Sequence, residues 1–247
     1  MVSLTEASLK TTVDTTRLGW LWWVVSPLIM MGIYYVFVKI ILGRGGENYH
    51  IFILTGIVAW QFFNNALIGT AQVVGQNAQL IKQVALPIPM LIMIPVLVQM
   101  TLAAVGVGII MLWNIQMTGF HSLLVFPLLL LTGMTSYGLG LFISVLNVYI
   151  SDISQLLQYI LRMAFFLSPV LFPAERVLQN EKIPEMIKII FHLNPMVTLI
   201  DGFRAVLIDG VFFALPNIMI LFFCVVFLIQ MGLVWVRRNT SQIIRML

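Results

Sequence analysis

Polar residues inside apolar segments are the first candidates for chemistry in this chain. One helical face of the fifth apolar segment carries such residues at spacings of three and four: Gln155, Tyr159, Arg162, Phe166 and Pro169. An arginine near the middle of a bilayer costs at least about 2.5 kcal/mol, so Arg162 is expected to face a water-filled path or a buried partner. Its guanidinium could hold a phosphate through paired hydrogen bonds, and a structural contact with a carbonyl or another helix is the alternative.

Patterns typical of an enzyme are not found in the sequence. His50, His121 and His192 are far apart and near the ends of apolar runs, which argues against a metal site. There is no GxxxxGK(S/T) loop, so ATP hydrolysis by the P-loop route would have to come from another chain. Asp152 stands alone, without the clustered carboxylates of a proton pump or a lipid-synthesising enzyme. We therefore predict no catalytic residue and no metal site.

The composition places these residues in a membrane. Of the 247 residues, 61% are hydrophobic and 9% are charged, against about 25% charged in a soluble domain. A water-soluble domain of this length could not cover so much apolar surface. The net charge of +4 lies in loops and tails, which fits a membrane surface and predicts no nucleic-acid partner. The single cysteine, Cys224, excludes an intrachain disulfide framework.

Six segments satisfy the requirement of about 20 apolar residues per membrane span. They are 18–42, 51–74, 88–113, 122–148, 153–172 and 211–236. The sequence therefore predicts one all-α, polytopic transmembrane domain over 1–247, with helices one to five in 18–172. The short N-terminal segment 1–17 and the tail 237–247 then lie on the same side. Arg237, Arg238 and Arg245 in that tail favour cytoplasmic termini.

The segment 173–210 between the last two predicted spans is not uniformly polar. Residues 183–193 and 196–208 each have the pattern of a short amphipathic helix, broken by Pro184 and by Asn194 with Pro195. Neither is long enough to span, and such helices are tolerated at membrane depth where they pack on protein or line a cavity. We predict a re-entrant or interfacial pair of helices, with an ordinary surface loop as the alternative.

Three more patterns suggest how individual helices pack or where they end. A stripe of mostly small residues in the fourth segment favours close helix packing: Gly133, Tyr137, Gly140, Ser144, Asn147 and Ser151. On the first segment one face is largely aromatic: Trp20, Trp23, Pro27, Met30 and Tyr34. Trp20, Trp22 and Trp23 are interpreted mainly as interfacial anchors. The connection 72–89 carries Lys82 and ends with two prolines, and a short cytoplasmic helix fits there.

These residues together resemble the membrane permeases of type-2 ABC exporters for O-antigen, capsule and teichoic acid, over nearly the whole chain. The matching positions are Leu18, Gly19, Trp22, Pro27, Gly56, Trp60, Phe62, Phe63, Asn77, Leu80, Ile81, Lys82, Pro87, Asp152, Ser168, Pro169, Val170, Asn194, Pro195 and Arg204. Each match is weak alone, and the ordered set is fairly specific. The chain departs at its front, where residues 3–16 hold only Lys10 as a base, whereas relatives usually have a longer basic amphipathic segment.

The resemblance implies a homodimeric permease in the inner membrane, working with two copies of an ABC ATPase that binds ATP and Mg, while this chain binds no cofactor. Its substrate would be a polysaccharide on a polyprenyl-pyrophosphate carrier, handled among membrane lipids. The coupling helix that docks on the ATPase would include Gln76, Asn77, Leu80, Ile81 and Lys82. The extracellular gate would include Pro184, Asn194, Pro195 and Arg204. The path between helices one and five would be lined by Tyr34, Tyr159, Arg162 and Phe166, with aromatic faces for the sugar chain.

Alternatives from other classes stay open. A type-2 ABC permease for a drug or another small molecule shares the fold and the partner, and the LG-x-x-W opening and the aromatic helix face argue against it. An intramembrane glycosyl or phospho-transferase would need a carboxylate pair or a histidine cluster near a bilayer face. A passive scaffold would not stimulate turnover of a co-purifying ATPase.

Overall fold

The structure is a computed structural model that describes residues 21–46, 48–83, 87–114 and 119–247, apart from the side chains of Trp23 and Phe120. The predictions for residues 1–17, for Leu18, Gly19 and Trp20 and for the Trp23 side chain lie outside the described part. Every regular element in the described ranges is a helix, so the predicted all-α class is confirmed.

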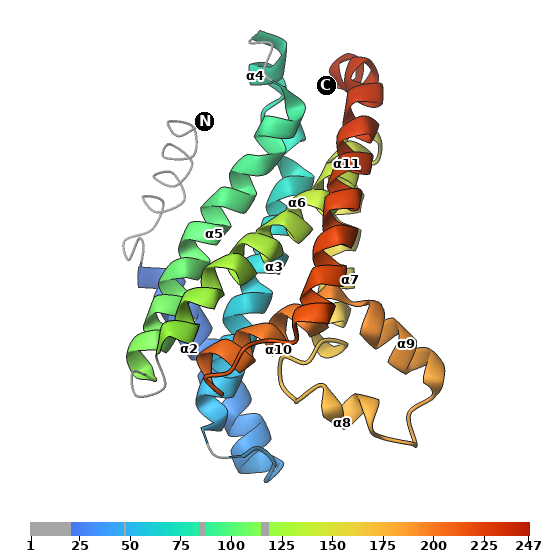
Figure 1. The fold of residues 1–247 in the computed structure, drawn as a ribbon. Helices are drawn as coiled ribbons and strands as arrows, with labels where there is room; N and C mark the ends of the chain where they lie inside the picture. The colour runs from blue at the N-terminus through green and yellow to red at the C-terminus, as the bar shows by residue number, and fades with distance from the viewer. Residues whose placement is uncertain (1–20, 47, 84–86, 115–118) are drawn as a thin grey trace.

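The helices follow one another along the chain with short connections (Figure 1). Their bounds are α2 (Leu21–Tyr35), the π-helix η1 (Val36–Ile41), α3 (Tyr49–Gln76), α4 (Ala78–Gln83), α5 (Ile88–Trp113), the 3-10 helix η2 (Phe120–Leu124), α6 (Val125–Tyr149), α7 (Ile153–Phe166), α8 (Glu175–Leu178), α9 (Glu185–Leu193), α10 (Pro195–Leu207) and α11 (Leu215–Met246). Among the described residues, five helical stretches are long and apolar enough to cross a membrane: Val24–Ile41, Tyr49–Gln76, Ile88–Trp113, His121–Tyr149 and Leu215–Met246.

Helices α3 and α6 form the centre of the bundle. About 72% of the apolar window of α3 and 67% of that of α6 is buried, compared with 11% for the first and last spans. Helices α5 and α6 pack on α3, and α11 packs on the other side of α6. The peripheral helices therefore present apolar side chains outward, as expected where the surrounding medium is hydrocarbon.

The small residues of α6 allow the close approach that the sequence predicts. A Cβ built on Gly140 would lie 2.6 Å from the Thr70 Oγ1 of α3, and one on Gly232 of α11 would lie 2.8 Å from the Cβ of Leu141. Because both distances are below normal van der Waals contact, larger side chains would push the helices apart. The packing interpretation of the stripe is confirmed at Gly140.

Gly140→Ala is expected to destabilise the bundle by about 1 to 3 kcal/mol, the usual cost of forcing an extra methyl group into a packed interior. Thermal unfolding of the purified, detergent-solubilised protein measures this effect as a lower midpoint. Gly108→Ala on α5 is the matched control, because a Cβ at Gly108 meets no atom within 4 Å. Equal midpoints for the two variants would contradict the assigned close contact.

The extent predicted for the fifth span, 153–172, is wrong. Helix α7 has 14 residues and ends at Phe166, so it is about 21 Å long at 1.5 Å per residue, short of the hydrocarbon core of about 30 Å. Pro169 explains the early end, because proline donates no backbone hydrogen bond and disfavours a helical conformation at Ser168. The sixth span also differs from its predicted bounds of 211–236, since α11 begins at Leu215 and continues to Met246.

The predicted pair of short helices between the last two spans is confirmed, and the alternative of an ordinary loop is excluded. Helices α9 and α10 meet at an angle of 69°. Asn194 caps α10 by accepting a hydrogen bond from the Met196 backbone N–H at 3.0 Å, and Pro195 occupies the first turn, where its missing N–H is not needed. Helices α8, α9 and α10 lie at the end of the molecule opposite α4 and the C-terminus (Figure 1).

Candidate functional site

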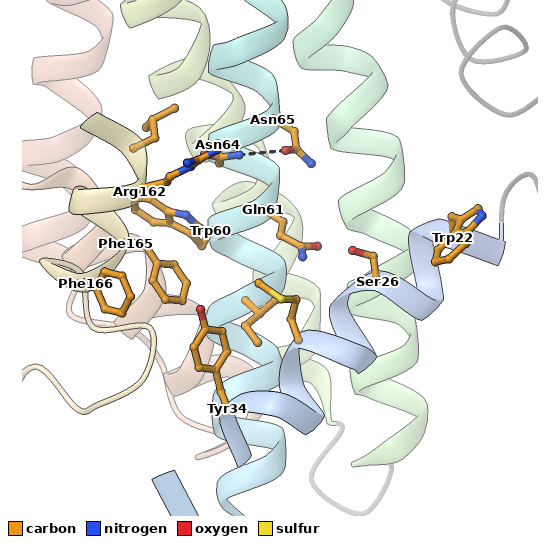
Figure 2. Close-up of a pocket in the computed structure, with 13 residues that line it drawn as sticks. Trp22, Ser26, Tyr34, Trp60, Gln61, Asn64, Asn65, Arg162, Phe165 and Phe166 are labelled. Carbon is orange, nitrogen blue, oxygen red and sulfur yellow. Dashed lines mark hydrogen bonds between the residues drawn. The ribbon is translucent and has the colours of Figure 1, made fainter. Parts of the chain in front are cut away.

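A cavity of about 630 Å³ lies between α2, α3 and α7. Its lining residues are Trp22, Ser26, Met30 and Tyr34 of α2, Ile57, Trp60, Gln61, Asn64 and Asn65 of α3, and Leu161, Arg162, Phe165 and Phe166 of α7. Figure 2 shows Tyr34, Trp60 and Phe165 of the three helices lying together, with Trp22 farther along α2. The volume lies in the range of small-molecule and cofactor sites, and the position between the first and fifth predicted spans is the one expected from the sequence.

Aromatic rings form one part of the cavity wall. The Phe165 ring stacks on Tyr34 with centroids 5.4 Å apart, and it meets Trp60 edge-on at 5.8 Å. Phe166 meets Phe165 edge-on at 5.2 Å. These offset and edge-to-face contacts hold the rings in place, because each ring is fixed by its neighbours. The cavity thus has a rigid aromatic surface supplied by three separate helices.

Polar side chains form another part of the wall. Gln61, Asn64 and Asn65 fall on one face of α3, and the Asn64 Nδ2 donates to the Asn65 Oδ1 at 3.0 Å. Arg162 adds the one charged group among the described lining residues. The sequence interpretation missed the three amides, although their spacing of three and one within an apolar run signals a polar helix face. A cavity of this kind offers hydrogen-bond donors and acceptors beside flat apolar surface.

Three of the four residues predicted for the path line this cavity, namely Tyr34, Arg162 and Phe166. The fourth, Tyr159, is 62% exposed and lies outside the lining of this cavity, so its place in the path stays a prediction. The Arg162 guanidinium carbon lies 5.4 Å from the centroid of the Tyr159 ring. Tyr159 therefore contacts Arg162 through a cation–π interaction.

The face of the first helix differs from the predicted one. Trp22 and Ser26 line the cavity together with Met30 and Tyr34. Pro27 is buried instead, beside a smaller space formed with α3 and α5. Met30 and Tyr34 of the predicted face therefore line the cavity and Pro27 does not, while Trp20 and the Trp23 side chain lie outside the described part.

The short helix predicted in the connection 72–89 is α4. Asn77 separates it from α3, and the Asn77 Nδ2 donates to the Val73 carbonyl at 2.8 Å. Lys82 and Gln76 are exposed, whereas Ile81 is buried in an apolar cluster. Ile81 thus holds the helix against the bundle, and the remaining predicted positions, Asn77 and Leu80, are partly buried. The exposed face of α4 consists of Gln79, Lys82 and Gln83.

The predicted gate residues lie in and around the bent pair α9 and α10. Pro184 precedes α9, and Asn194 and Pro195 begin α10. Arg204 is 5% exposed. Its Nη2 donates to the Val170 carbonyl at 2.8 Å and to the Phe52 carbonyl at 3.4 Å, and its guanidinium carbon lies 3.4 Å from the centroid of the Phe52 ring. Arg204 therefore fastens α10 to α3 and to the turn after α7.

Two more side chains hold that turn. The Asn194 Nδ2 donates to the Ser168 Oγ at 2.7 Å, and the Tyr49 hydroxyl donates to the Leu171 carbonyl at 2.6 Å. The turn 168–171 is thus bonded from α3, from the start of α10 and from the interior of α10. It connects the α7 wall of the cavity directly to α10.

Several known proteins are similar to this chain in sequence. A family model described as ABC-2 type transporter matches residues 1–208. Two proteins of Klebsiella pneumoniae named O-antigen export system permease protein RfbA are 26% and 24% identical to the chain, over 94% and 85% of it and 89% and 81% of their own lengths. A protein of the same name from Myxococcus xanthus is 24% identical over 83% of the chain and 79% of its own length. Because the family match covers most of the sequence, this chain belongs to the ABC-2 type transporter family.

Proposed function

We propose that the chain is the membrane-spanning subunit of an ABC exporter that moves polyprenyl-pyrophosphate-linked, O-antigen-like polysaccharide across the inner membrane. Membership of the ABC-2 family supports the role of a transport permease working with a separate ATPase. The names of the relatives from Klebsiella pneumoniae and Myxococcus xanthus support O-antigen as the substrate class. ATP and Mg bind to the partner subunit in this proposal.

The cavity between α2, α3 and α7 carries the substrate assignment. A polysaccharide presents apolar C–H faces and a dense array of hydroxyl groups, and the carrier adds a diphosphate. The Tyr34, Trp60 and Phe165 rings offer flat surface to the C–H faces of the sugars. The amide side chains of α3 can exchange hydrogen bonds with the sugar hydroxyl groups. The Arg162 guanidinium suits the diphosphate, because its planar donors match phosphate oxygens.

A second copy of the chain completes the path in this proposal. Helix α7 carries exposed apolar side chains beside the cavity, including Ile160, Met163 and Phe166. Such a surface, next to an arginine that is costly in lipid, is better covered by protein than by acyl chains. We therefore place the contact between the two copies of a homodimer at this face, with two ATPase copies docked at the α4 ends. The α4 end and the C-terminus face the cytoplasm, as Arg237, Arg238 and Arg245 favour.

Movement of the ATPases would reach the cavity through α3. This helix runs without a break from Tyr49 to Gln76, next to α4, and it carries Trp60 and Asn64 in the cavity wall. A push on α4 would therefore displace the wall itself and separate α2 from α7. The permease contributes shape and binding groups, and the free energy comes from nucleotide hydrolysis in the partner.

Deletion of the permease tests this assignment. Polyprenyl-linked polymer is expected to accumulate in the cytoplasm and to disappear from the cell surface, and expression of the intact chain restores export. Extraction of the lipid-linked polymer and surface labelling measure the two pools. Normal surface polymer in the deletion strain, combined with greater sensitivity to a drug, would instead favour the small-molecule permease.

A further inference from the structure

A second cavity, of about 440 Å³, lies at the end of the molecule opposite α4. Its wall comes from α8, α9, α10, the start of α11 and the beginning of α3. We propose that this cavity binds one sugar ring of the exported chain by its hydroxyl groups. The inference rests on the proposed function for the identity of the ligand, and its geometry is independent of the first cavity.

Arg204 is the observation that points to a ligand here. Its side chain lines the cavity and is almost fully buried, and its Nε and Nη1 have no hydrogen-bond partner among the described residues. The bonds of Nη2 to Val170 and Phe52 hold the guanidinium in position. A buried donor without an acceptor costs about 1 to 3 kcal/mol. The Arg204 guanidinium is therefore held in place, and a ligand that supplies a hydrogen-bond acceptor would remove this free-energy cost.

The distance from Arg204 to Asp201 indicates a hydroxyl group as that acceptor. The Arg204 Nη1 and the Asp201 Oδ1 are 3.9 Å apart, which is too far for a direct hydrogen bond. A hydroxyl group placed beside both atoms could accept from the guanidinium and donate to the carboxylate. Thr198 and Asn217 in the same wall offer more donors and acceptors to neighbouring hydroxyl groups.

The charges of the wall favour a neutral ligand over a phosphate. Glu175, Asp201 and Asp209 line the cavity, and Arg204 is the one arginine or lysine among its lining residues. A phosphate would therefore meet more negative than positive charge. Burial raises the pKa of the Asp209 carboxyl, although Arg204 acts in the opposite direction. Binding is best measured at mildly alkaline pH, because a higher pH offsets the raised pKa of Asp209.

Apolar surface completes the match to a sugar ring. Phe212, Phe213 and Ile218 line the cavity beside the polar groups. A sugar ring presents C–H groups on its faces and hydroxyl groups at its edge, so a wall with both kinds of surface can hold it. The cavity lies where an emerging polymer would pass the re-entrant helices.

Cysteine protection tests the site directly. Cys224 is the single cysteine of the chain, so Cys224→Ser removes the background and Thr198→Cys places a thiol in the cavity wall. The rate of maleimide modification is measured on the purified full-length chain with glucose, galactose, mannose or rhamnose. At a sugar concentration of twice the Kd, occupancy of two thirds lowers the rate by about threefold. Inorganic phosphate and phosphoethanolamine are the comparison probes.

Asp201→Leu is expected to abolish the protection, because it removes the acceptor without changing the size of the side chain greatly. Asp201→Asn, a smaller change, is expected to weaken it. Glu181→Gln is the control, since Glu181 is exposed in the same segment and outside the lining. The proposal would be overturned if none of the four sugars protects the cysteine, or if Asp201→Leu leaves the protection unchanged. Stronger protection by phosphoethanolamine than by the sugars would overturn it as well. If polymer accumulates in the deletion strain but no sugar protects the cysteine, the sugar site is contradicted and the proposed function is not. If a sugar protects the cysteine but no polymer accumulates, the proposed function is contradicted.

Discussion

Replacing Gln79, Lys82 and Gln83 of α4 together by alanine is expected to lower ATP-driven polymer export by about tenfold or more, because losing one central docking contact costs about 1.4 kcal/mol or more. These three side chains are the exposed face of the helix, while Ile81 holds it against the bundle. Alanine keeps the helical conformation, so the change removes contacts without unfolding α4. Surface polymer and the ATPase rate of the purified complex are the measurements.

The matched control lies at the other end of the molecule. Glu181→Ala with Lys182→Ala removes exposed polar side chains from the segment between α8 and α9. This double variant is expected to leave the coupling of ATP hydrolysis to export unchanged. Export at the normal level in the α4 variant, with ATPase still bound, would show that the partner docks elsewhere.

Arg162→Ala is expected to reduce export by about tenfold or more, because a charge-assisted hydrogen bond contributes about 1.5 to 3 kcal/mol. The residue supplies the charge of the cavity wall, beside the amides of α3. Arg162→Lys is expected to retain part of the activity, since lysine keeps the charge and loses the paired donors. Export is measured with the amount of permease in the membrane as the reference.

Met231→Ala is the control for this change. Met231 lies on α11, is exposed and lies outside the cavity lining. Its truncation is expected to leave export near the level of the unchanged chain. If Arg162→Ala exports as well as Met231→Ala at equal protein levels, the guanidinium does not contact the phosphate-bearing carrier.

Long apolar runs bounded by prolines could be predicted accurately from the sequence. The third predicted span, 88–113, agrees with α5 at both ends, because Pro87 and Pro89 define the start and the polar Asn114 follows the last apolar residue. The pair α9 and α10 was predicted for the same reason, from Pro184, Asn194 and Pro195. Local signals of this kind act within a few residues and need no tertiary information.

Features that depend on distant contacts could not be predicted. Arg204 was assigned to an outer gate, and nothing near it in the sequence indicates that its partners are Val170 and Phe52. The end of α7 was placed too late for another reason, because the apolar run continues to Phe172 and outweighed the local stop signal of Pro169. The amides Gln61, Asn64 and Asn65 were missed, although their spacing on an apolar helix was visible. The cavity wall combines residues of α2, α3 and α7, so its composition depends on how these helices pack and not on any one segment of the sequence.

The turn 168–171 joins two parts of the molecule that are far apart in the sequence. Tyr49, Asn194 and Arg204 each bond to a different residue of this turn. The cavity wall that carries Arg162 is therefore tied to α10. A displacement of α7 would be transmitted through the turn to α10, so the two parts would not move independently of each other.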